Sequence, residues 1–235
     1  MHIAIIGFGR MGRAIVELAK AKGHKLTVIT RNEDLRAILM SEQPDVAIEF
    51  TLPEAAPGNI KLCLESGVPV VCGTTGWNEY RSEIESICVQ NNGALFVASN
   101  FSLGVNLFFR INEQLATLMK GRQEYHPAIH EIHHTGKKDA PSGTAITLAD
   151  GILRHHPDLA GWSSDGKDLN KLQVTSERID PYPGRHEVRW TGPVDSIEII
   201  HHAVSRQGFA AGALAVAEWL PGKSGVLGMS DFLPA

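Results

Sequence analysis

The sequence is poor in cysteine, in long hydrophobic runs and in clustered basic residues. Its three cysteines, Cys63, Cys72 and Cys88, show no C-x-x-C spacing, which argues against a disulfide framework and against a thiolate zinc site. No apolar run approaches the roughly 18 residues of a membrane span, and no cleavable leader is visible, so we expect a cytoplasmic protein. The net charge of -4, with scattered lysine and arginine, indicates neither nucleic acid nor membrane as a partner.

The first hundred residues alternate between short apolar runs and helical spacing. The expected strands are His2–Ile6, Lys25–Thr30, Val46–Phe50, Val68–Cys72 and Ala94–Ala98. The expected helices are Arg13–Lys22, Asp34–Met40, Glu54–Ser66 and Glu79–Gln90. Strands that alternate with helices predict an α/β fold with a parallel sheet and right-handed crossovers.

After about Asn100 the pattern changes. Helices are expected at Val105–Lys120 and Gly143–Arg154, and strands at Glu124–His134, Leu172–Arg178, His186–Trp190 and Ser196–Val204. Three strand candidates in close succession predict a separate mixed or antiparallel sheet, with the two helices as its cover. A last helix is expected at Ala210–Leu220, where Pro221 and Gly222 follow.

A glycine-rich turn links the first strand to the first helix. The segment reads G-F-G-R-M-G, and its residues are Gly7, Phe8, Gly9, Arg10, Met11 and Gly12. In the G-x-G-x-x-G pattern the first glycine permits a tight turn, the second lets backbone approach a pyrophosphate, and the third allows close packing. The helix N-terminus favours the anionic phosphates. The pattern predicts a nicotinamide dinucleotide site; a glycine turn in an unrelated sheet is the alternative.

The end of the second strand bears on which dinucleotide binds. An acidic residue there would bind the ribose of NADH, but this chain has Thr30, Arg31 and Asn32. A guanidinium suits a 2'-phosphate, so we predict that Arg31 binds NADPH, with NADH a weaker cofactor. Arg31 pointing into solvent remains the alternative.

Two further segments follow parallel strands directly. Gly73, Thr74 and Thr75 come after one strand, and Ala98, Ser99, Asn100 and Phe101 come at the end of the next. Open sheets bind ligands beyond the carboxyl ends of their strands, so we expect both segments to face the nicotinamide, unless they are simple turns.

The stretch EIHHTGKKDAPSGTA, residues 131–145, holds the other candidate site. In a strand Glu131 and His133 share one face and His134 points away, unless the chain bends there. Ser142 is expected to cap the helix that follows, leaving the N–H groups of Ser142, Gly143 and Thr144 as donors for a carboxylate. With His134 and Lys137, these residues predict a pocket for an anionic substrate beside a proton donor.

A metal site is the competing interpretation of the histidines. His130, His133 and His134 have H-x-x-H-H spacing, but the neighbouring lysines would repel a cation and no cysteine joins them. We predict no metal. Solvated histidines and lysines without a function are the second alternative.

The sequence resembles the dihydrodipicolinate reductase family of lysine biosynthesis, by the diaminopimelate route. HHTGKKDAPSGTA from His133 matches the family's core pattern of a histidine pair, a lysine four residues after the first histidine, and DAPSGTA. Supporting matches cover nearly the whole chain: GRMGR from Gly9, IEFTLPEA from Ile48, VCGTTG from Val71, NFSLGVN from Asn100, TSER from Thr175 and HHAVSRQGFAAGAL from His201.

The resemblance implies the fold, the reaction and the roles of residues. It implies a Rossmann-type dinucleotide-binding domain, 1–100 with 205–235, and an α+β substrate-binding and tetramerisation domain with a mixed open sheet, 101–204. The reaction would be the NAD(P)H-dependent reduction of 4-hydroxy-tetrahydrodipicolinate, a small dicarboxylate, by a homotetramer. His133 would be the acid/base position, Lys137 the proton donor, His134 a substrate contact, and Ser142, Gly143 and Thr144 the carboxylate cradle.

The chain departs from the family pattern at three places. The glycine turn is one residue shorter than usual, Ser99 stands where proline is common, and Thr30 precedes Arg31 where an acidic residue is frequent. These departures leave the expected reaction intact but argue against dual cofactor use, and so strengthen the predicted NADPH preference. A different nicotinamide-dependent reductase, such as an amino-acid dehydrogenase, and a dinucleotide-sensing protein without turnover are the other functions that the sequence leaves open.

Overall fold

The computed structural model describes residues 1–166, 168, 170–205 and 207–233, and divides the chain into two compact units. Unit 1 comprises Met1–Ser102 with Gln207–Ala235, and unit 2 comprises Leu103–Arg206. The division predicted from the sequence, at Asn100 and Val204, lies close to these bounds. The roles given there to the two domains stay predictions.

Unit 1 is a six-stranded parallel sheet in the order β11-β5-β4-β3-β1-β2. Its strands are β1 (His2–Ile6), β2 (Lys25–Ile29), β3 (Val46–Glu49), β4 (Val70–Cys72), β5 (Ala94–Val97) and β11 (Gly225–Leu227). Its helices are α1 (Arg10–Ala21), α2 (Leu35–Glu42), α3 (Ala56–Glu65), the short η1 (Asn78–Tyr80), α4 (Arg81–Gln90), α7 (Gln207–Trp219) and α8 (Met229–Phe232). The predicted Rossmann-type parallel sheet is confirmed.

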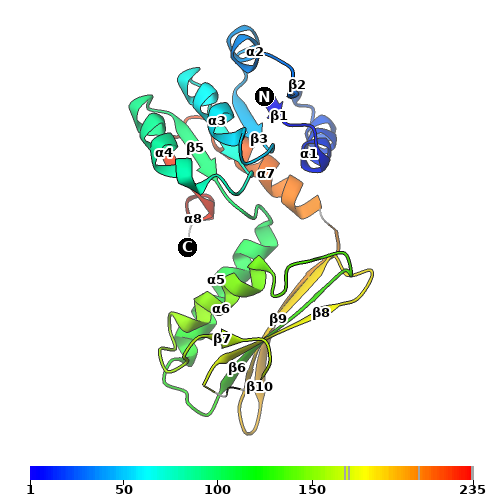
Figure 1. Cartoon of the computed structure of the whole chain (residues 1–235), viewed down its shortest axis with the longest axis vertical. Coiled ribbons are helices and arrows are strands. Elements are labelled where there is room, and N and C mark those ends of the chain that lie inside the picture. Colours follow the sequence, from blue (N-terminus) through cyan, green and yellow to red (C-terminus); the bar gives the residue numbers. More distant parts are fainter. Residues whose placement is uncertain (167, 169, 206, 234–235) are drawn as a thin grey trace. The chain divides into compact units, whose positions relative to one another are not determined.

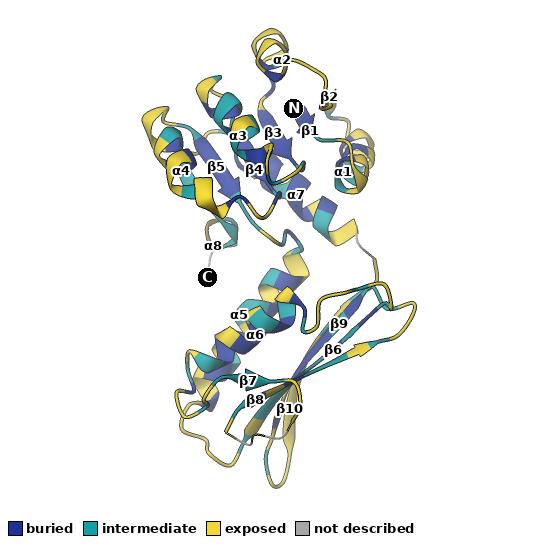
Figure 2. Ribbon diagram, in the orientation of Figure 1, coloured by how far each residue is buried: buried dark blue, intermediate teal, exposed yellow. Residues whose placement is uncertain are grey.

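The helices of unit 1 cover both faces of its sheet (Figure 1). One core joins alternate strand residues, such as Ile5 and Ile48, to α1 and α7. The other joins the intervening residues, such as Ala47 and Leu95, to α2, α3 and α4. Figure 2 shows strands β1, β3, β4 and β5 as largely buried, which explains why their sequences are almost continuously apolar.

Unit 2 is a five-stranded mixed sheet in the order β10-β9-β6-β8-β7. Its strands are β6 (His126–His133), β7 (Trp162–Ser163), β8 (Leu172–Arg178), β9 (Gly184–Thr191) and β10 (Ser196–Ala203), and its helices are α5 (Leu103–Met119) and α6 (Gly143–Leu153). Strand β6 runs parallel to β8 and antiparallel to β9. Both helices pack on one face of this sheet, as predicted (Figure 1).

Three elements were not predicted from the sequence, and several boundaries move. The unpredicted elements are β7, β11 and α8, each four residues or shorter. Helix α1 begins at Arg10, three residues before its predicted start, because Gly9 is its N-cap. Arg10 and Met11 of the glycine motif therefore belong to the first turn of the helix.

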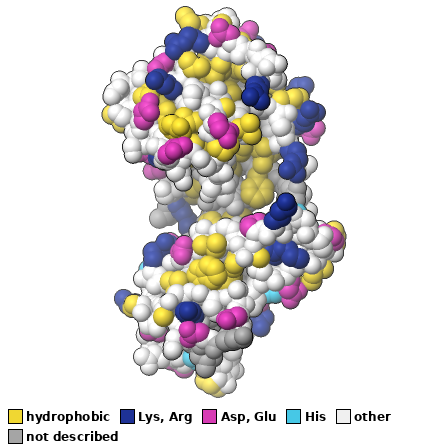
Figure 3. Space-filling view, viewed as in Figure 1, with side chains coloured by type: hydrophobic (Ala, Val, Ile, Leu, Met, Phe, Trp, Pro, Cys, Tyr) yellow, Lys and Arg dark blue, Asp and Glu magenta, His cyan; other side chains and the backbone are white. Residues whose placement is uncertain are grey.

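The cysteine thiols lie in the interior of unit 1, and the drawn surface carries mixed charge. Cys63, Cys72 and Cys88 are free and buried. Charged side chains of both signs are interspersed on the face drawn in Figure 3. Within the described ranges, no helix is both long enough and apolar enough to span a bilayer.

Candidate functional site

The carboxyl ends of β1, β3, β4 and β5 lie at one edge of the unit 1 sheet. The parallel registers place Ile6 beside Glu49, Glu49 beside Cys72, and Cys72 beside Val97. Strand β2 lies on one side of β1, whereas β3, β4 and β5 follow one another on its other side. The strand order therefore reverses direction between β1 and β3. Such a switch point is where open α/β sheets bind ligands.

Three glycines shape the turn after β1. Gly7 has a φ of +97°, and a Cβ there would lie 2.2 Å from the Phe50 carbonyl oxygen. A Cβ at Gly12 would lie 2.1 Å from the Gly7 carbonyl oxygen. The tight turn and the close packing predicted for these two glycines are confirmed. Gly9 differs, since a Cβ there would meet open space among the described residues, as approach of a ligand to the backbone requires.

A cavity of about 340 Å³ lies beside this turn. Its lining includes six predicted cofactor contacts: Gly9, Arg10, Met11, Gly73, Thr74 and Thr75. It also includes three residues that the sequence did not single out: Phe50, Thr51 and Pro53. The first turn of α1 presents backbone N–H groups here, and a helix N-terminus favours phosphate. The residues present therefore fit the pyrophosphate of a dinucleotide.

The wall of this cavity is fixed by Glu49, a fully buried carboxylate at the end of β3. It accepts hydrogen bonds from the Thr51 hydroxyl, from Asn59 Nδ2 at 3.4 Å and from Cys72 Sγ at 3.3 Å. The Thr51 N–H in turn donates to Thr74 Oγ1 at 2.8 Å. Burial and the Glu49 charge raise the pKa of the Cys72 thiol above its usual value, so this thiol is not a nucleophile.

Two of the remaining predicted contacts have surroundings that the sequence did not indicate. Phe101 is buried in the core, with its ring centroid 5.7 Å from that of Phe50, so only its backbone could meet a cofactor. Near exposed Arg31, the Glu33 carboxylate accepts hydrogen bonds from the Thr30 N–H at 2.6 Å and the Thr30 hydroxyl at 2.7 Å. The inference that no acidic group stands at this strand end is therefore wrong, because the turn folds Glu33 back onto it.

In unit 2, alternation along β6 places Glu131 and His133 on the face covered by the helices. Both are buried, whereas His130 lies on the other face, with Nδ1 2.9 Å from Thr175 Oγ1. His134 follows the end of the strand. The strand therefore separates the three histidines that the H-x-x-H-H spacing had grouped as a possible metal site.

Glu131 is fully buried and accepts three kinds of hydrogen bond. The Ser142 N–H donates to both carboxylate oxygens at 3.1 and 3.2 Å, Ser176 Oγ donates at 2.8 Å, and Arg178 Nη2 donates at 3.2 Å. Burial raises the pKa of this carboxyl group, but hydrogen bonds from His186, Ser142 and Ser176 outweigh it and bring the pKa well below its usual range. Glu131 is therefore ionised at neutral pH.

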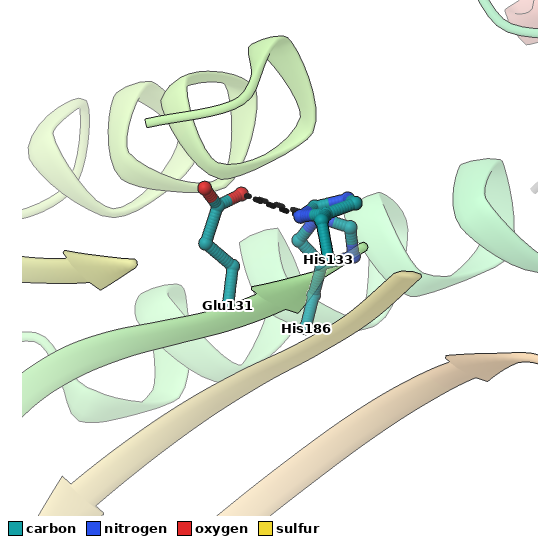
Figure 4. Close-up of side chains that lie close together, drawn as sticks. All are labelled: Glu131, His133 and His186. Carbon is teal, nitrogen blue, oxygen red and sulfur yellow. Dashed lines mark ion pairs between the residues drawn. The ribbon is translucent and has the colours of Figure 1, made fainter. Parts of the chain in front are cut away.

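Two imidazoles meet this carboxylate (Figure 4). His133 Nδ1 and His186 Nε2 each lie 3.6 Å from Glu131 Oε2, and the two rings pack edge to face with centroids 4.9 Å apart. Burial and the neighbouring His186 lower the pKa of His133 to about 4, against the opposing effect of Glu131. His133 is thus a neutral imidazole at pH 7.

The segment that joins β6 to α6 carries Lys137. Its ammonium group contacts Asp139 at 2.9 Å. The Arg178 guanidinium donates to the Lys137 carbonyl at 3.4 Å and to the Asp139 carbonyl at 2.5 Å, so the backbone on both sides of residue 138 is fastened to β8.

Ser142 caps α6, as the sequence predicts, with its Oγ accepting from the Ala145 N–H at 3.2 Å. The expectation that the Ser142 N–H is an open donor is wrong, because the buried Glu131 carboxylate requires a partner and takes it. Of the three N–H groups predicted to bind a substrate carboxylate, those of Gly143 and Thr144 therefore remain as candidate donors. A Cβ added at Gly143 would meet open space among the described residues.

Glu131, His133 and His186 could also be considered as metal ligands, since their ligand atoms lie within 4.8 Å of one another. However, the Arg178 guanidinium lies at hydrogen-bond distance from the same carboxylate and would repel a cation. The donor set suits a metal less well than it suits the hydrogen bonds already present. The absence of a metal stays a prediction.

Sequence reasoning missed the residues that gather around His133 from neighbouring strands. His186 pairs with Glu131 across β6 and β9, and Arg178 pairs with His133 across β6 and β8. The available signal was alternation: His186 shares the buried face of β9 with Val188 and Trp190, where an imidazole needs a polar partner.

Comparison with known proteins places both halves of the chain in one family. The model named "Dihydrodipicolinate reductase, N-terminus" matches residues 1–101, and "Dihydrodipicolinate reductase, C-terminus" matches residues 104–233. The 4-hydroxy-tetrahydrodipicolinate reductase of Christiangramia forsetii is 44% identical over 99% of this chain and 98% of its own length. That of Archaeoglobus fulgidus is 35% identical over 99% and 100%.

A solved structure is similar across the same length. The dipicolinate-bound dihydrodipicolinate reductase from Paenisporosarcina sp. TG-14 superposes with a TM-score of 0.84, at 20% identity, over 99% of both chains. At this level of identity the likeness establishes the fold.

Proposed function

Since the chain belongs to the dihydrodipicolinate reductase family, we propose that it reduces 4-hydroxy-tetrahydrodipicolinate with NADPH as the preferred reductant, and with NADH more weakly. The chain is an oxidoreductase of the lysine and diaminopimelate pathway, and the family uses a nicotinamide dinucleotide. The match over both halves of the chain supports the reaction. The runner-up, an amino-acid dehydrogenase, lacks such support.

A small dicarboxylate substrate is supported by the donors at the start of α6. The N–H groups of Gly143 and Thr144 and the Ser142 hydroxyl are proposed to hold one substrate carboxylate, with His134 as a further contact. The solved relative that carries dipicolinate binds a dicarboxylate, which agrees with this assignment. Held in this way, the ring is oriented before reaction, and positioning accounts for part of the rate.

Lys137 is proposed as the proton donor. The bound cofactor supplies a hydride, and the reduced ring must then gain a proton. His133, with a pKa of about 4, is neutral at pH 7 and does not carry a spare proton. The Lys137 ammonium group can donate, and the same acid can assist the loss of the 4-hydroxyl group as water. His133 is proposed to orient the substrate beside it.

The NADPH preference is supported by the exposed cationic side chain of Arg31, next to the end of β2. Its guanidinium can bind a 2'-phosphate through charge-assisted bonds. Glu33 lies nearby, but its carboxylate is folded back onto Thr30. Removing the Glu33 charge should therefore tighten NADPH binding more than NADH binding, because only NADPH carries the phosphate that a carboxylate repels.

A homotetramer is proposed to form through the free face of the unit 2 sheet, and the cytoplasm is proposed as its location. Side chains that point away from α5 and α6, such as Ile200 and Arg189, remain exposed. Light scattering on the purified chain tests the tetramer, and a monomer at micromolar concentration would contradict it.

The deciding experiment is a coupled assay. Aspartate semialdehyde and pyruvate are condensed enzymatically to supply the substrate. Oxidation of NADPH or NADH is then followed by the absorbance of the reduced nicotinamide at ~340 nm. We expect substrate-dependent oxidation with a higher kcat/KM for NADPH. A chain that binds NADPH without substrate-dependent oxidation would be a dinucleotide-binding protein instead.

A further inference from the structure

Glu131 and Arg178 lie behind the segment that carries Lys137. Arg178, at the end of β8, donates from Nε to the Lys137 carbonyl at 3.4 Å and from Nη2 to the Asp139 carbonyl at 2.5 Å. A guanidinium is a rigid planar fork, so two bonds from it fix both the position and the orientation of the backbone that they reach.

Arg178 is itself fixed by Glu131. Its Nη2 lies 3.2 Å from Glu131 Oε1, and Glu131 is fully buried in β6. The same carboxylate accepts both bonds from the Ser142 N–H, which starts α6. Glu131 therefore holds the end of the β6–α6 connection directly, through the Ser142 N–H, and holds the middle of this connection indirectly, through Arg178.

We propose that Glu131 and Arg178 form a positioning pair that sets the distance between the Lys137 ammonium group and the carboxylate-binding first turn of α6. This inference rests on the proposed function, because it assigns the pair a task in that reaction. Neither residue touches the substrate in this proposal.

The start of this connection is also held by Asp180, which accepts hydrogen bonds from Thr135, but the Arg178 bonds reach the carbonyls on either side of residue 138. Lys137 has a long flexible side chain, and its described ion-pair partner, Asp139, belongs to the same connection. If the backbone of this connection moves, the donor and the cradle move relative to one another. A displacement near 1 Å can reduce a rate by about 10²-fold when the geometry of the reacting groups is strict.

The main test replaces Glu131 by Gln, which keeps the shape but removes the charge and presents an amide NH₂ to the existing donors. We expect kcat/KM to fall by about 10²-fold. The affinity for dipicolinate, measured by calorimetry, should weaken, and the affinity for NADPH should stay unchanged. The matched control is Glu113→Gln, which breaks a surface ion pair with Arg154 near the other end of α6 and should keep kcat/KM within about threefold of the unmodified chain.

A double variant separates positioning from mere stability. Removing one partner of a buried ion pair is costly, whereas replacing both partners is often tolerated. Glu131→Gln combined with Arg178→Met should therefore regain much of the lost melting temperature while kcat/KM stays low. If activity returns together with stability, or if Glu131→Gln alone keeps the kcat/KM of the unmodified chain, the positioning role is wrong.

Two further outcomes are decisive. Should Glu131→Gln fail to fold, Arg178→Lys carries the test, because a lysine ammonium cannot span both carbonyls and the carboxylate; full activity would overturn the proposal. If the unmodified chain shows no substrate-dependent oxidation of NADPH, the proposed function fails, and dipicolinate affinity across the same variants still decides whether the pair positions a dicarboxylate site.

Discussion

Replacing His133 by Asn should flatten the dependence of folding stability on pH. His133 is 7% exposed, and burial together with His186 lowers its pKa in the folded chain to about 4. An unfolded chain exposes the same imidazole to water, where its pKa is about 6.5. Asparagine is polar, similar in size and neutral at every pH, so the variant loses this titration.

The sign and the size follow from proton linkage. Above about pH 6.5 the imidazole is neutral in both states and contributes no pH dependence. As the pH falls, the unfolded chain binds a proton that the folded chain refuses, so stability is lost down to about pH 4. At pH 5 the loss is about 2 kcal/mol, which corresponds to a shift of roughly 4 to 8 °C in melting temperature for a chain of this length.

The assay is the melting temperature at pH 8 and at pH 5 for both proteins. Other titrating groups are common to the two and cancel in the comparison. The melting temperature of the unmodified chain should fall further than that of the variant by the stated amount. His126→Asn is the control, since this residue of the same strand is exposed in the folded chain. Equal shifts in His133→Asn and the unmodified chain would refute the burial of a neutral imidazole.

Four further substitutions test the two sites. Lys137→Ala should lower kcat by roughly 10² to 10⁴-fold without changing NADPH affinity. The control is Lys138→Ala, at an exposed residue, and its kcat should stay close to that of the unmodified chain. Undiminished turnover in Lys137→Ala would remove Lys137 from the mechanism. Arg31→Ala should raise the NADPH dissociation constant, measured by fluorescence titration, far more than that for NADH, and an equal effect on both rejects a 2'-phosphate contact. Gly12→Ala places a Cβ 2.1 Å from the Gly7 carbonyl oxygen, so both nucleotides should bind more weakly; unchanged titrations would contradict the packing described for this turn. Ser142→Ala removes a helix cap and should cost about 1 kcal/mol in chemical denaturation, and an unchanged unfolding midpoint would count against the cap.

Most of unit 1 could be predicted because strands β1, β3, β4 and β5 are buried on both faces. A continuous apolar run such as His2–Ile6, followed by glycine and then by helical spacing, has few other interpretations. The elements that were missed are short. Gly225–Leu227 completes the sheet as an edge strand beside β5, but three residues are too few for any period to appear, and only the register with Ala94–Phe96 defines them as a strand.

The candidate site in unit 2 could be predicted only along a single segment. Spacing within β6 correctly placed Glu131 and His133 on one face. The side chains that meet them, Arg178 and His186, come from β8 and β9, and which residues face them depends on strand register. A one-residue change of register would have turned both side chains to the other face, so the sequence alone could not assign them.

The charges around His133 bear on the proposal that Lys137 is the proton donor. Glu131 is buried and ionised, with the Arg178 guanidinium 3.2 Å from one of its oxygens and His186 Nε2 3.6 Å from the other. His133 stays neutral because burial lowers its pKa, and the neighbouring His186, Lys137 and Arg178 act in the same direction. This arrangement supports the proposal that the Lys137 ammonium group, rather than His133, supplies the proton to a ligand held at the start of α6. In the proposed mechanism the enzyme binds an anion and protonates it at neutral pH without charging His133.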